Sequence, residues 1–192
     1  MICRYRSRRF IAIAVVVVTV ICAAWAYYRV WHADRYPYGR THACDMLLYN
    51  MLAQYAEDNN GAFPAGQATP EASLSLLYRM DPNVAYLLAG KSASVEEAER
   101  LLSSGQLLDP NTCSWHYVEG LRRSDDPGLA LFWDKVGLGH HDERTTGDGH
   151  NVWFLGTRKR WISAEEWPSF IKEQEKLLPK RPGITPAVLK QH

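Results

Sequence analysis

The sequence predicts an α+β fold in which an apolar N-terminal helix precedes an amphipathic helix packed on a small antiparallel β-sheet. Three observations indicate this class. An uncharged apolar run follows the basic residues 1–9, residues 44–105 repeat apolar side chains at helical spacing, and short aromatic or β-branched runs recur within residues 115–163. A chain of 192 residues is long enough for one compact domain with an appendage. The net charge of +1, with acids and bases interspersed, offers no basic face to a nucleic acid.

The first predicted element is a transmembrane helix at residues 10–31. Residues 10–28 carry no charged side chain. An α-helix of this length rises about 1.5 Å per residue and nearly covers the roughly 30 Å hydrocarbon core. The preceding residues 1–9 are basic, with Arg4, Arg6, Arg8 and Arg9. Because positive segments stay in the cytoplasm, we expect residues 1–9 to be cytoplasmic and the domain to be periplasmic, held by a single pass through the inner membrane.

A cleaved signal peptide is the alternative interpretation of this segment. Ala24 and Ala26 have the A-x-A spacing that a signal peptidase accepts. The anchor is favoured because aromatic side chains, which prefer the headgroup region, gather at the far end of the apolar run. These side chains are Trp25, Tyr27, Tyr28 and Trp31. Either route exports residues 32 onward.

Export places two cysteines, Cys44 and Cys113, in an oxidising compartment, where we expect them to form a disulfide. The bridge would close a loop of about 70 residues and stabilise the fold by roughly 4 kcal/mol. The alternative is that both are buried thiols that act as small apolar side chains.

Residues 32–42 form a predicted linker, in which Pro37 and Gly39 interrupt any helix that leaves the membrane. The extracytoplasmic domain is expected at residues 43–178 and begins with an amphipathic helix. The apolar side chains of this helix recur at helical spacing at Cys44, Leu47, Leu48, Met51, Leu52 and Tyr55. The same spacing directs Cys44 toward the core.

Short helices are expected in the middle of the chain. The first helix ends at residues 59–61, which tolerate positive φ, and Pro64 prevents its continuation. Two short helical pieces follow, separated by an Asp-Pro pair. A further helix begins at Ser94, which has the capping-box spacing with Glu97, and ends at Gly105.

Short strands are expected next, because β-branched and aromatic runs alternate with turn residues. The runs are residues 115–121, 129–134, 151–156 and 158–163. The last two runs are joined by a Gly-Thr-Arg hairpin signal. A closing helix is predicted at residues 164–178 with Ser163 as its N-cap, and the proline-punctuated residues 179–192 are expected to be a flexible tail.

The order of these elements resembles that of type IV pilin-like proteins, in particular the major pseudopilins of type II secretion. In many such proteins a helix ends in Tyr, a polar pair, Gly and an aromatic residue before Pro. The matching residues here are Tyr55, Asn59, Asn60, Gly61, Phe63 and Pro64. In some relatives a strand ends in Asp, a loop rich in His and Gly follows, and an N-V-x-F strand comes next. The matching residues here are Asp134, Asn151, Val152 and Phe154.

This resemblance covers most of residues 10–167 and implies a pilin-like domain. It also implies a structural or accessory component of a type II secretion or type IV pilus-like system, with protein partners from that assembly and no catalytic residue. It does not extend to the processing site. Prepilins are cleaved after a Gly that precedes a Phe-led apolar run with Glu at its fifth position, but Arg9 precedes Phe10 and Ala14 takes the Glu position.

We therefore expect a permanently anchored, non-enzymatic protein. Two alternatives stay open. One is a standalone periplasmic binding module on a pilin-like fold, and the other is a metal-dependent hydrolase that uses the polar loop at residues 139–150.

This loop is the candidate metal site. Its carboxylates, Asp142, Glu143 and Asp148, are hard oxygen donors of the kind that calcium prefers. The resemblance implies calcium as well, because major pseudopilins bind it in a late loop. Zinc is disfavoured because no spacing fixes two histidines on one side, the histidines being His140, His141 and His150. Otherwise the loop is a solvated connection in which Gly147 and Gly149 permit the turn, and no other cofactor is expected.

Other catalytic arrangements are not expected. Ser114 and His116 lie on one strand and do not meet as a nucleophile and a base within hydrogen-bond reach. The strand tryptophans, Trp115, Trp133, Trp153 and Trp161, are expected to pack within the sheet. An exposed subset of them is the alternative, as a face that binds a glycan or a protein.

Overall fold

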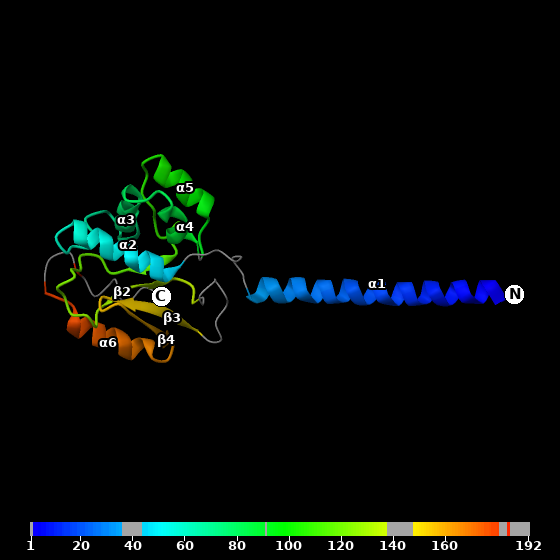
Figure 1. Cartoon of the computed structure of the whole chain (residues 1–192). Coiled ribbons are helices and arrows are strands. Elements are labelled where there is room, and N and C mark those ends of the chain that lie inside the picture. The colour runs from blue at the N-terminus through cyan, green and yellow to red at the C-terminus, as the bar shows by residue number, and fades with distance from the viewer. Residues whose placement is uncertain (1, 36–43, 91, 138–147, 181–183, 185–192) are drawn as a thin grey trace.

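The computed structural model describes residues 2–35, 44–90, 92–137, 148–180 and 184. Its first element is α1 (Ile2–Arg35), the long blue helix in Figure 1. The section Ala12–Arg35 is long and apolar enough to span a membrane, and the mean hydropathy of an 18-residue window within it is 2.0. The helix is longer than the predicted span, because it also takes in the basic residues 2–9 and residues 32–35 of the predicted linker.

Helix α2 (Asp45–Asp58) confirms the amphipathic helix, but its buried face is rotated from the predicted one. The buried side chains are Asp45, Leu48, Tyr49, Leu52 and Ala56. Leu47 is 41% exposed, and Met51 and Tyr55 are only half-buried. Cys44 is the half-buried N-cap of the helix, so the prediction that it points into the core is wrong.

Two contacts with the sheet fix the orientation of α2. The carboxylate of Asp45 forms an ion pair with Lys159, with 2.8 Å between Oδ2 and Nζ. The Tyr49 ring stacks on Trp153 at a centroid distance of 5.0 Å, and its hydroxyl donates to the carbonyl oxygen of Leu155 at 2.9 Å. Neither contact is visible in the spacing of apolar residues along the helix.

Short helices follow α2 and cover the same side of the molecule in Figure 1. They are α3 (Pro70–Leu74), the 3-10 helix η1 (Ser75–Arg79), α4 (Val84–Ala89) and α5 (Val95–Ser103). Thr69 caps α3, and Ser94 caps α5 by accepting a hydrogen bond from the Glu97 N–H at 3.2 Å. The cap at Ser94 is the predicted one.

The sheet is an antiparallel meander with the strand order β1-β2-β3-β4. Its strands are β1 (Trp115–Tyr117), β2 (Ala130–Asp134), β3 (Gly149–Phe154) and β4 (Arg158–Ser163). The predicted hairpin between the last two strands is confirmed, with Thr157 at φ 59 in its turn. Strand β1 is shorter than expected, because the chain turns at Gly120, which has φ 82.

Helices cover both faces of the sheet, so the domain has a core on each side (Figure 1). Toward α2, Phe132 stacks on Trp153 at 6.2 Å and meets Trp115 edge-on at 5.3 Å. Toward α6 (Trp167–Leu177), Trp133 meets Trp167 at 5.7 Å. The α+β class is therefore confirmed, with an aromatic core between helices and sheet.

Helix α6 begins at Trp167 and not at residue 164, and its N-cap is Glu166 rather than the predicted Ser163. The reason is local, because the Glu166 carboxylate accepts hydrogen bonds from the N–H and hydroxyl of Ser163, both at 3.1 Å, which closes a turn before the helix. Buried Gln174 then ties the helix to the sheet by accepting from the Ala130 N–H at 2.7 Å. In the predicted tail, Ile184 is half-buried and packs against the core.

Candidate functional site

The end of strand β2 is the candidate functional site, because its charged residues Asp134 and Lys135 lie there and His150 of strand β3 contacts Asp134. Asp134 is fully buried, and its Oδ1 accepts a hydrogen bond from the Asn151 N–H at 3.0 Å. His150 Nδ1 donates to the main-chain carbonyl oxygen of Asp134 at 2.7 Å and lies 3.4 Å from its Oδ1. The His150 ring also packs on Trp167 at 4.9 Å. The structure therefore brings together Asp134 and Asn151, which the pilin-like motif singled out.

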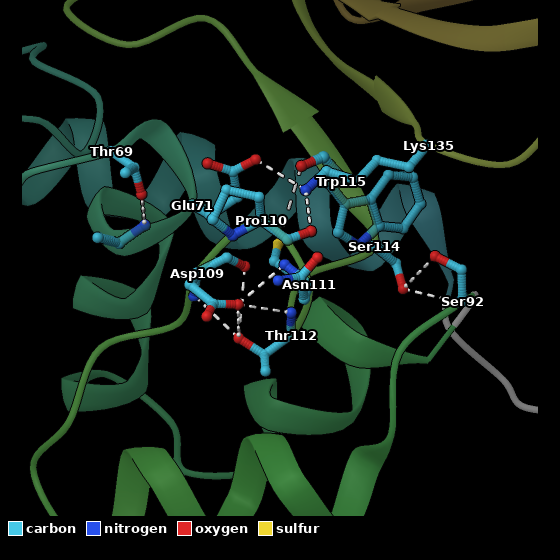
Figure 2. A network of polar contacts seen from close by, with 12 residues as sticks. Thr69, Glu71, Ser92, Asp109, Pro110, Asn111, Thr112, Ser114, Trp115 and Lys135 are labelled. Atoms are coloured by element: carbon cyan, nitrogen blue, oxygen red, sulfur yellow. Dashed lines mark hydrogen bonds and ion pairs between the residues drawn. The ribbon is translucent and has the colours of Figure 1, made fainter. Parts of the chain in front are cut away.

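Lys135, the next residue, is bound from two sides, as Figure 2 shows. Its Nζ lies 2.7 Å from Glu71 Oε1 on α3 and donates to the carbonyl oxygen of Pro110 at 2.7 Å. The side chains of Lys135 and Glu71 are 15% and 4% exposed. The Lys135 ammonium group therefore forms a largely buried ion pair that joins the end of β2 to α3.

Ser114 is a second polar junction (Figure 2). Its side chain is fully buried, and its hydroxyl donates to the Ala89 carbonyl oxygen at 2.6 Å. The same oxygen accepts hydrogen bonds from the N–H groups of Ser92 and Ala93. Ser114 therefore holds the end of α4 and the segment before α5 against β1.

The two ends of the loop approach each other through glycines. A Cβ on Gly137 would collide with the carbonyl oxygen of Gly149. A Cβ on Gly149 would lie 2.7 Å from the Trp161 ring. Gly149 was expected to permit a turn, but it lies within β3, where its missing side chain makes room for Trp161.

The predicted metal ligands lie largely beyond the described part of the chain. The predicted calcium ligands Asp142 and Glu143 are outside it, as are His140 and His141 of the disfavoured zinc alternative. Asp148 is exposed, and its main-chain carbonyl oxygen accepts a hydrogen bond from the Ala164 N–H at 2.8 Å. Among the described residues, no group of three or more His, Cys, Asp or Glu side chains converges on one point.

The first pilin-like motif forms a separate cluster near β1. Asn60 has φ 54 and Gly61 has φ 81, and the Gly61 N–H closes the helix on the Ala56 carbonyl oxygen at 2.7 Å. Beyond this turn, the N–H of buried Phe63 donates to Leu121 at 3.2 Å. The remaining motif residues have structural contacts as well. Asn59 Nδ2 donates to the Tyr55 carbonyl oxygen, the Tyr117 hydroxyl donates to that of Pro64, and Val152 and Phe154 are buried.

The expected disulfide is absent, since Cys44 and Cys113 are both free thiols. They belong to opposite edges of the sheet. Cys113 is buried just before edge strand β1, whereas Cys44 starts the helix whose next residue is ion-paired with Lys159 on the other edge strand, β4. Their alternative interpretation, as two apolar thiols, fits Cys113.

Three of the four strand tryptophans are buried in the sheet. Trp115 and Trp133 are 0% exposed and Trp153 is 5% exposed, while Trp161 is half-buried. Burial removes Trp115, Trp133 and Trp153 from the predicted glycan- or protein-binding face, whereas for the half-buried Trp161 that alternative stays a prediction.

No family model, curated protein or solved structure matches the chain. What the residues define is an α+β domain on an apolar helix, with buried polar junctions that link its helices to the sheet. The Glu71–Lys135 and Asp45–Lys159 pairs were not predicted, because their members are 64 and 114 positions apart in the sequence. The one available signal was Asp45 itself, an acidic residue in the first turn of a helix.

Proposed function

We propose that this chain is a non-enzymatic, pilin-like protein of the inner membrane, with its domain in the periplasm. It serves as a structural or accessory component of a type II secretion or type IV pilus-like system. One observation carries the proposal. An apolar helix is followed by an amphipathic helix that packs on an antiparallel sheet through Tyr49 and Trp153, in the order that the pilin resemblance implies.

The orientation is supported by the charges that flank the apolar helix. Basic residues precede the span, as a cytoplasmic N-terminus requires.

At the other end, the guanidinium of Arg29 lies 5.5 Å from the Trp25 ring, and that of Arg35 lies 5.5 Å from the Trp31 ring. Arginines stacked on aromatic rings suit the headgroup region, where both the ring and the charge are stabilised.

A role in assembly rather than chemistry is supported by the use of the polar side chains. The side chains of Ser114, Lys135 and His150 have the chemistry of catalytic groups. Each of them makes contacts that join elements of the fold. By contrast, α2 exposes large apolar side chains, with Met46 at 57% and Leu47 at 41%. Apolar side chains on an exposed helix face are suited to packing against another subunit.

The test is photo-crosslinking from α2 in a bacterium that has a type II secretion system. A benzophenone amino acid replaces Met46 or Leu47 in the full chain, and adducts are identified by mass spectrometry. We expect adducts with pilin-like subunits. The same group at exposed Glu99 on α5 is the control and should give none. Absence of pilin-like adducts from α2, or equal adducts from the control, contradicts the proposal.

A further inference from the structure

A groove lies between strand β4 and helix α6, away from the end of β2. It contains a cavity of about 280 Å³ that is lined by the rings of Phe154 and Phe170 and by the side chains of Arg158 and Arg160. A second hollow of about 470 Å³ adjoins it, shares Arg160, Phe170 and Glu173 with it, and is also lined by Glu165 and Glu166. The groove therefore combines an apolar lining with arginines on its strand side and glutamates on its helix side.

The two arginines are held in place by the rings beneath them. The guanidinium of Arg158 lies 5.2 Å from the Phe154 centroid, and that of Arg160 lies 6.0 Å from the Phe170 centroid. Both residues are exposed, and neither makes a salt bridge within the described part of the chain. Stacking orients a guanidinium without using its N–H donors. The N–H donors of Arg158 and Arg160 therefore stay available to bind carboxylates.

Lys159, between them, has a different role. It points to the other face of the sheet, where its ammonium pairs with Asp45 and lies 5.8 Å from the Trp153 ring. The register places Arg158 opposite Phe154 and Arg160 opposite Val152, so the two arginines share the α6 face. The groove thus presents cations at alternate positions of one strand.

Carboxylates of α6 limit the directions from which an anion can approach. Glu166 is engaged by Ser163, whose N–H is the main cause of its lowered pKa, and the charge of Arg160 adds to this effect. Glu173 lines the groove opposite the strand and, in the described part of the chain, makes no ion pair with either arginine. An acidic ligand is therefore favoured along β4 and disfavoured along α6.

Strand β4 is also an edge of the sheet. It is the last strand in the order β1-β2-β3-β4, and no described strand pairs with its outer side. Residues 158–160 are exposed, and among the described residues their main chain makes no backbone hydrogen bond outside the β3–β4 pairing. The main-chain groups on the outer side of β4 are therefore open to a further strand.

We propose that β4 docks an extended acidic segment of a partner protein, which adds to the sheet as a strand with carboxylates opposite Arg158 and Arg160. Alternate residues of a strand lie roughly 6.6 Å apart on one face, so acidic residues at alternate positions match the spacing of the arginines. A second copy of β4 would bring like charges together. This site does not depend on a pilin-like identity.

The experiment uses the full chain in detergent micelles and a fluorescent eight-residue peptide of alternating glutamate and threonine. Its binding is followed by anisotropy. We expect the variant Arg158→Glu/Arg160→Glu to bind about tenfold more weakly or worse, and Glu173→Gln to bind about twofold more tightly. The control, Lys172→Glu/Lys176→Glu, changes the net charge equally at exposed positions of α6 that do not line the cavity, and should bind like the native chain.

Hydrogen exchange separates strand addition from general charge attraction. With the peptide bound, the amides of residues 158–160 should exchange more slowly, whereas a lysine–threonine peptide should neither bind nor protect them. The proposal is overturned if the control variant weakens binding as much as the arginine variant does. It is also overturned if the acidic peptide fails to bind the native chain, or binds without protecting β4. Circular dichroism confirms that each variant is folded.

Discussion

At the scale of single residues, the Cys113 thiol gives the sharpest expectation. It is fully enclosed before β1, and this burial raises its pKa to about 12. Only the thiolate reacts with alkylating agents. In the native protein at about pH 8, we therefore expect iodoacetamide to modify the half-buried Cys44 and to spare Cys113 until urea unfolds the chain. Peptide mapping by mass spectrometry measures both sites.

The same thiol makes stability depend on pH. The unfolded thiol ionises near 9.0, so between pH 9 and about 12 the unfolded state loses a proton that the native state retains. The free energy of unfolding should fall as the pH rises through this window, and Cys113→Ala should remove this contribution.

The alkylation experiment can also contradict the two free thiols. It would do so if peptide mapping recovered Cys44 linked to Cys113, with neither thiol alkylated before reduction.

At the scale of elements, the Glu71–Lys135 pair joins α3 to the end of β2. Lys135→Met leaves the Glu71 carboxylate, which is 4% exposed, without its counter-charge. We expect the free energy of unfolding to fall by about 3 kcal/mol, because an unpaired buried charge is strongly destabilising. Urea unfolding followed by tryptophan fluorescence measures this change.

A second variant separates the charge from the shape of the side chain. In Glu71→Gln/Lys135→Met the buried charge is gone, so part of the lost stability should return. If the double variant is as unstable as the single one, the loss arises from packing around Lys135 and the ion pair does not explain it.

Most elements were predictable because each depends on a local pattern. The hairpin before Arg158, the cap at Ser94 and the helix end at Gly61 all follow from side chains within a few residues of each other. The buried face of α2 was not predictable, because it is fixed by Lys159 and Trp153, which lie about a hundred residues further along the chain. Helical periodicity alone did not determine which face of α2 is buried, because packing against distant residues determines it.

The candidate functional site was likewise predictable where the signal is local and not where it depends on contacts between distant elements. The motif marked Asp134 and Asn151, which meet, but it carried no signal for Lys135 and Glu71, whose contact depends on how α3 lies against β2. The disulfide between Cys44 and Cys113 was predicted only from the expected oxidising compartment and from the helical spacing that places Cys44 on the apolar face. This prediction failed because the two residues belong to opposite edges of the sheet.

At the scale of the whole molecule, an apolar helix that can span a membrane precedes a domain whose buried polar groups join its helices to its sheet. Its exposed features, the apolar side chains of α2 and the arginines of β4, are suited to contact with other proteins. The central claim is a pilin-like domain that stays attached to its helix. This claim depends on Arg9 and Ala14, which occupy the positions of the Gly and Glu of a prepilin.

The most direct measurement is the intact mass of the full chain recovered from membranes of a bacterium, with and without a co-expressed prepilin peptidase. We predict the same uncleaved mass in both preparations, with the protein retained in the membrane fraction after alkaline washing. A mass that shows loss of residues 1–9 when the peptidase is present would contradict permanent anchoring and make the chain a processed pseudopilin subunit. Cleavage after Ala26 in both preparations would contradict the anchor itself and make the domain a soluble secreted protein.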